Sequence, residues 1–185
     1  MSQNKTPQEL LAQEQAYKEH IHHTKINAAA IIDHILGNIH TLHVKLHQYH
    51  WYVKGPQFYT LHEKFEALYD ANEAAFDSLA ELLIASGFKP ASTTAELVNY
   101  SMLKEDAADK YLSAEEMVAN IVEDLRSTRE LTIRAISLAA EEGNAALEDG
   151  LINYKASLDK NIWMLQAFLG QDPFDGDDNV DEDDE

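Results

Sequence analysis

The chain contains no cysteine, which excludes disulfide bonds and thiolate chemistry and leaves histidine and carboxylates as the main metal ligands. Seven glycines and four prolines supply little of the turn chemistry that a many-stranded sheet needs. No apolar run approaches the ~18 residues of a membrane span, and the N-terminus lacks the apolar core of a signal peptide. These absences predict a helical, cytoplasmic protein.

Basic residues are also scarce, because 14 Lys and Arg stand against 33 Asp and Glu, for a formal net charge of -19. Nine of the acids and none of the bases lie in residues 172–185, which leaves 24 acids against 14 bases in the rest. A field of this sign repels nucleic acid and anionic membrane surfaces, and it attracts cations. The charge therefore favours metal ions as partners and disfavours DNA.

Apolar residues recur at steps of three and four in four long segments, which is the spacing of amphipathic helices. The apolar content of 45% is that of one globular domain. We therefore predict an all-α four-helix bundle over residues 26–170. Capping boxes, in which Ser or Thr is followed three residues later by Glu, predict helix starts at Thr6, Thr60, Thr93 and Ser113.

Three further segments flank or interrupt this bundle. Residues 1–25 form an N-terminal arm with a short helix of its own. Residues 91–112 connect the second long helix to the third, and they carry a short crossover helix at 95–100. Residues 171–185 are acidic and poor in apolar side chains, which predicts a disordered tail.

The residues 47–70, HQYHWYVKGPQFYTLHEKFEALYD, gather histidines and carboxylates around a Gly-Pro turn. His62 and Glu66 are four residues apart on the second long helix, and so are Asp77 and Glu81, so each pair shares a helix face. Both pairs lie on one stripe, but they are separated by ~16 Å along the helix. One chain therefore cannot bring all four side chains together.

Two chains can do so, because the two pairs lie symmetrically about the Ala71-Asn72 junction. A two-fold axis there would set the first pair of one chain beside the second pair of its mate, and His50 would add a further nitrogen from across the turn. Such a mixed nitrogen and oxygen set suits Fe(II), Zn(II), Mn(II) or Co(II). From spacing alone, a solvated helix face is the alternative interpretation.

Other charged and aromatic residues lie close to this stripe. Asp70 and Glu73 fall nearest to the predicted axis, where like charges from two chains would oppose each other. A row of three histidines continues the spacing of His50 along the first long helix, and it is consistent with a metal relay or with polar interface residues. Taken alone, the neighbouring Trp51 would be a core residue.

This hairpin, followed by AAFDSLAELLIASG, resembles the most specific signature of the Dps family, the dodecameric mini-ferritins, and NYKASLDKNIWMLQAFLG resembles the family's last helix. The resemblance covers residues 26–170 and implies a ferritin-like bundle. It implies that each ferroxidase site takes nitrogen ligands from one chain and carboxylates from another, with one more carboxylate and a tryptophan beside the iron. In this sequence these residues are His50, His62, Asp77, Glu81, Glu66 and Trp51.

The resemblance also implies a function. A shell of twelve subunits, built from two-fold dimers, would oxidise Fe(II), preferably with hydrogen peroxide, and store the ferric mineral inside, which protects against oxidative stress. Zinc or another divalent metal would occupy the same site as iron. The alternative is a nucleoid-associated protein that protects DNA by binding it, with secondary or vestigial ferroxidase activity.

Two peripheral sites complete the predictions. The acidic lining of the family's iron-entry pore would fall on Glu148 and Asp149, near the start of the last helix. An accessory metal site would use His20, His22 and His23 in the arm. Simple flexibility of the arm is the alternative to that second site.

Overall fold

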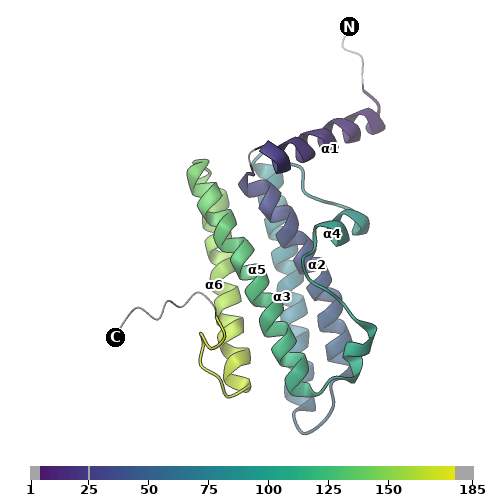
Figure 1. Ribbon diagram of the computed structural model, residues 1–185, viewed down its shortest axis with the longest axis vertical. Coiled ribbons are helices and arrows are strands. Elements are labelled where there is room, and N and C mark those ends of the chain that lie inside the picture. Colours follow the sequence, from purple (N-terminus) through teal and green to yellow (C-terminus); the bar gives the residue numbers. More distant parts are fainter. Residues whose placement is uncertain (1–4, 25, 178–185) are drawn as a thin grey trace, which may run out of the picture.

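The computed structural model describes residues 5–24 and 26–177, with the side chains of residues 22–24 excepted. Every regular element in these ranges is a helix, and four long helices form the bundle (Figure 1): α2 (Ala28–Tyr52), α3 (Phe58–Ala85), α5 (Ala114–Glu141) and α6 (Ala145–Phe168). The prediction of an all-α bundle is confirmed. None of the described helices is both long and apolar enough to cross a membrane.

Shorter helices join or flank the four. The crossover between α3 and α5 carries α4 (Thr94–Tyr100) and the 3-10 helix η1 (Ala107–Tyr111), of which only the first was predicted. The capping boxes at Thr6, Thr93 and Ser113 are confirmed by reciprocal bonds between the cap residue and the glutamate three residues later. These caps satisfy amide groups that the first turn of a helix leaves without an intrahelical acceptor.

The predicted start of α3 at Thr60 is wrong. The helix begins at Phe58, and its N-cap residue Gln57 makes no side-chain capping bond. The reason lies in the turn, where Gly55 adopts a φ of 107° and accepts a hydrogen bond from the Phe58 amide at 3.1 Å. Because the left-handed glycine already turns the chain towards the helix, no capping side chain is needed to start it.

α2 and α3 form an antiparallel hairpin because their apolar stripes face one core. At the turn, Tyr49 and Phe65 are both fully buried, with ring centroids 5.9 Å apart. Leu61 and Val53 close the same end of the core. Burial of each such side chain contributes roughly 1.5–3 kcal/mol, so the two helix ends that flank the turn are held at a fixed separation.

The N-terminal arm is the helix α1 (Pro7–Thr24), which crosses the end of the bundle where α2 begins (Figure 1). Lys18 Nζ lies 3.1 Å from a carboxylate oxygen of Asp33, which is a buried residue of α2. The second oxygen of Asp33 accepts the Ala91 amide at 2.7 Å. Burial raises the pKa of the Asp33 carboxyl, although both partners favour its charged form. One buried carboxylate therefore joins the arm to the crossover.

The first part of the acidic tail contacts the bundle. Residues 171–177 turn back onto the bundle, and Asp177 lies between two arginines of α5, at 3.1 Å from Arg126 Nε and 2.7 Å from an Arg129 guanidinium nitrogen. The arginines offset the carboxylate charge that the composition counts as unpaired, and the disordered tail stays a prediction. The rest of the predicted tail lies outside the described residues.

Replacing Asp177 by alanine is expected to free this segment without unfolding the bundle. The two charge-assisted bonds of Asp177 attach this segment to α5 and are not part of the bundle core. The amides of the segment should therefore exchange about tenfold faster, while those of the core keep their protection. Hydrogen exchange followed by mass spectrometry measures both effects. Asp172→Ala is the matched control, since it removes one carboxylate from the same segment with no ion pair at that position; equal acceleration in both variants would contradict the expectation.

Candidate metal centre

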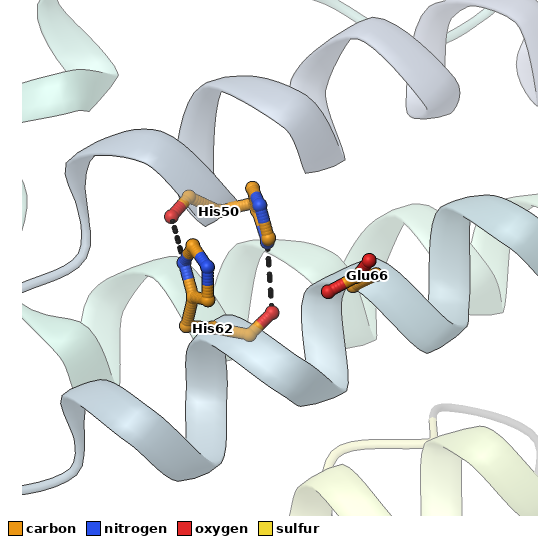
Figure 2. Close-up of side chains that lie close together, drawn as sticks. All are labelled: His50, His62 and Glu66. Atoms are coloured by element: carbon orange, nitrogen blue, oxygen red, sulfur yellow. Dashed lines mark hydrogen bonds between the residues drawn. The ribbon is translucent and has the colours of Figure 1, made fainter.

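Three potential metal ligands meet beside the turn of the hairpin. Figure 2 shows His50 in the last turn of α2, facing His62 and Glu66 in the first turns of α3. One ligand atom from each side chain lies within 4.8 Å of the others, and no other group of three is this close in the described part of the chain. Two ligands of one ion are at most about 4.4 Å apart, so small side-chain adjustments would bring all three onto one ion.

The two histidines orient each other through their backbones. Nδ1 of His50 lies 2.8 Å from the carbonyl oxygen of His62, and Nδ1 of His62 lies 2.8 Å from the carbonyl oxygen of His50 (Figure 2). Since a carbonyl only accepts, each Nδ1 is the donor, and Nε2 of each neutral ring keeps a free lone pair. The rings stack with centroids 3.6 Å apart. The hairpin therefore presents two nitrogen ligands in one fixed tautomer.

Burial differs among the three side chains. His50 is 9% exposed and His62 is half-buried, whereas Glu66 is exposed. Because burial decreases from His50 through His62 to Glu66, the site opens towards the outside of the hairpin.

Asp77 and Glu81 are exposed on α3, and Asp77 lies eleven residues beyond Glu66. That separation corresponds to ~16 Å along the helix, so the chain does not bring these carboxylates to the histidines. Between them the stripe carries the exposed small residues Ala71 and Ala74, which would let a second helix approach closely. The shared site between two chains stays a prediction.

Trp51 is 65% exposed, so its interpretation as a core residue is wrong. Its ring meets the edge of His47, with centroids 5.5 Å apart. The chain places the indole on the outer surface of the hairpin because the buried positions on either side are taken by Tyr49 and Val53. Its role beside a metal stays a prediction.

The row of histidines on α2 forms a connected half-buried ladder. His47 donates to the carbonyl oxygen of His43 at 2.8 Å and stacks on Tyr69, with ring centroids 3.9 Å apart. Burial, and then the charge of His47, lower the pKa of His43, which keeps that imidazole neutral near pH 7. These side chains are packed polar groups and not a solvated surface.

The two peripheral sites are less complete. Asp149 is exposed near the start of α6 and accepts a bond from Asn153 at 3.3 Å, and Glu148 beside it is half-buried. A pore needs several chains, so these residues stay predicted pore residues. In the arm, His20 is exposed, whereas the side chains of His22 and His23 lie outside the described residues. The accessory site therefore stays a prediction as well.

Comparison with known proteins agrees with this architecture. The family model of the ferritin-like domain matches residues 29–174. A relative from Listeria innocua, named DNA protection during starvation protein, is 36% identical over 148 residues, which cover 80% of this chain and 95% of the relative.

Solved structures give the same result in three dimensions. The DpsB protein of Lactococcus lactis has a TM-score of 0.86 at 27% identity, covering 91% of this chain and 96% of that one. A Dps structure from Listeria innocua, soaked with zinc, has a TM-score of 0.76 at 36% identity, covering 80% and 99% of the two chains. The match to the ferritin-like family model, the shared fold and the sequence identity together show that the chain belongs to the Dps family of ferritin-like proteins.

Proposed function

We propose that this protein is a ferroxidase and iron-storage protein of the cytoplasm. It oxidises Fe(II) with hydrogen peroxide at sites shared by two chains, and it keeps the ferric product inside a shell of twelve subunits. The observation that carries the proposal is the reciprocally bonded pair of His50 and His62, which presents two free nitrogens beside the carboxylate of Glu66. Iron is the substrate and the stored product of this reaction.

The donor set fits Fe(II) on chemical grounds. Imidazole nitrogen and carboxylate oxygen are donors of intermediate hardness, which Fe(II), Zn(II) and Co(II) all accept. A related structure from Listeria innocua comes from a crystal soaked with zinc, and zinc is a useful probe of the same donors here. A net charge of -19 raises the local concentration of any such cation.

The nitrogen and carboxylate ligands have different proposed roles. The neutral nitrogens of His50 and His62 bind Fe(II) without repelling it, and the carboxylates of Glu66 and of the partner's Asp77 and Glu81 add negative charge. Negative ligands stabilise Fe(III) more than Fe(II), so they favour loss of the electron. Two Fe(II) ions each give one electron to one peroxide, whose O–O bond breaks to leave two hydroxide ions.

This reaction removes both reagents that generate hydroxyl radicals, so it protects DNA without contact between protein and DNA. That distinction matters because the name of the Listeria innocua relative refers to DNA protection. Among residues 5–24 and 26–177, two of the arginines, Arg126 and Arg129, already pair with Asp177. Direct DNA binding is therefore the weaker candidate.

The test is a double variant, Asp77→Ala with Glu81→Ala, loaded with Fe(II) without oxygen and then mixed with peroxide. We expect iron oxidation, followed by absorbance, to slow by at least about tenfold, because loss of a ligand costs more than the 10–100-fold loss typical of outer-shell partners. Glu105→Ala with Glu130→Ala removes the same charge from exposed positions elsewhere and should oxidise iron normally. The assignment fails if the first variant is as fast as the wild type.

A further inference from the structure

The arrangement around His50 is repeated two helical turns away. His43 lies seven residues before His50 on α2, and Tyr69 and Glu73 lie seven residues after His62 and Glu66 on α3. Seven residues make almost two full turns, so the repeat lies on the same face of the hairpin, ~10 Å from the first group. Because α2 and α3 are antiparallel, seven residues back along α2 and seven residues forward along α3 lead to the same level of the hairpin.

The contacts are repeated as well as the spacing. The imidazole of His43 meets the ring of Tyr69 with centroids 6.0 Å apart, and the imidazole of His50 meets that of His62 at 3.6 Å. Glu73 and His43 line the same recess on this face of the hairpin.

An open recess of about 170 Å³ lies at this point, large enough for a cation with bound water. It lies over α2 and α3, next to the histidine ladder. The recess is lined by Ile39, His40, His43, Asn72, Glu73 and Phe76.

The repeat differs from the first group in one ligand. Tyr69 occupies the place of His62, and its ring stacks on His47 instead of on the repeated histidine. The second group therefore has one nitrogen fewer within its own chain. It is incomplete unless a second chain contributes to it.

The two-fold axis required by the proposed function supplies that contribution. The axis that sets the partner's Asp77 opposite Glu66 also sets the partner's Asp70 opposite Glu73, because both pairs are centred on the Ala71-Asn72 junction. Two carboxylates brought together there repel each other unless a cation lies between them.

We propose that His43, Glu73 and the partner's Asp70 form a second divalent-cation site, with His40 at its edge. The proposal rests on the proposed function, because it needs the same dimer. With one nitrogen and two carboxylates, the site is harder than the first and favours Mn(II) or Fe(II) over softer ions. Each dimer then carries four cation sites in a line across its interface, the two new ones nearest to the axis.

The experiment is calorimetric titration of the assembled protein with Co(II) alone, which probes both donor sets without oxidation. The wild type is expected to show two classes of site. His43→Ala with Glu73→Gln should weaken the second class by at least about tenfold and leave the first, whereas Asp77→Ala with Glu81→Ala should do the opposite. Glu130→Gln, an exposed carboxylate on α5, is the control and should change neither class.

Asp70→Asn is a milder second variant, since it changes one exposed side chain and is expected to weaken only the second class. A single class in the wild type overturns the proposal, and so does a His43→Ala, Glu73→Gln variant that keeps both classes. Failure of the ferroxidase proposal is seen separately, as rapid iron oxidation by the Asp77→Ala, Glu81→Ala variant.

Discussion

Two inactive variants are expected to restore iron oxidation when they are assembled together. One variant lacks the nitrogen ligands, through His50→Ala and His62→Ala, and the other lacks the partner carboxylates, through Asp77→Ala and Glu81→Ala. Co-expressed at equal levels, they should oxidise Fe(II) at about one quarter of the wild-type rate. Each variant alone should be nearly inactive, so the expected gain is large.

The value of one quarter follows from the symmetry of the dimer. Random pairing makes half of the dimers mixed, and each mixed dimer contains one site with all its ligands and one site that keeps only Glu66. If His50, His62 and the two carboxylates belonged to a site within one chain, no pairing could restore it. The oxidation rate of the co-expressed variants therefore shows whether two chains share the site.

The control is a mixture of the two variants after each has assembled separately, in which mixed dimers do not form unless subunits exchange. Stopped-flow absorbance gives the rate, and mass spectrometry gives the ratio of the two chains. Recovery no greater than the sum of the separate variants, at a ratio near one, would exclude a shared site.

Much of the fold follows from local patterns. The four long helices could be predicted because apolar residues at helical spacing must bury one face, and glycine or proline stands at most of their ends. The start of α3 at Phe58 could not be predicted, because Gly55 determines it through a left-handed turn that a side-chain motif does not encode. The contact of Asp177 with Arg126 and Arg129 was also missed, since it joins residues about fifty positions apart.

In the metal centre, too, the contacts within one helix could be predicted and those between helices could not. The spacing of His62 and Glu66 predicts a shared face on one helix, and the structure places them together. The reciprocal bonds to His50 depend on the register between α2 and α3, which apolar periodicity leaves open by several residues. The repeat at His43 was missed for the same reason, although a shift of seven residues is the signal that could have revealed it.

The largest effect on stability is expected from Lys45→Met. Lys45 Nζ lies 2.7 Å from a carboxylate oxygen of Asp124, and this pair joins α2 to α5 with side chains only 7% and 12% exposed. The variant leaves the carboxylate buried without its cation, which typically costs 3–5 kcal/mol. Urea denaturation at one fixed protein concentration measures the loss, because assembly also contributes to stability.

Two measurements test whether the unpaired Asp124 carboxylate causes this loss of stability: its dependence on pH and its response to a second substitution. Burial already raises the pKa of Asp124, and Lys45 opposes that shift, so its removal raises the pKa further. A carboxyl whose folded-state pKa is raised stabilises the fold below its ordinary pKa of ~3.9, and that contribution is lost as the pH rises through the folded-state value. The deficit of Lys45→Met should therefore be greatest at neutral pH and shrink towards pH ~4.

Lys45→Met with Asp124→Leu should recover to within about 1 kcal/mol of the wild type, because an apolar pair needs no counter-charge. A double variant as unstable as the single one would mean that lost packing, and not the unpaired carboxylate, causes the defect.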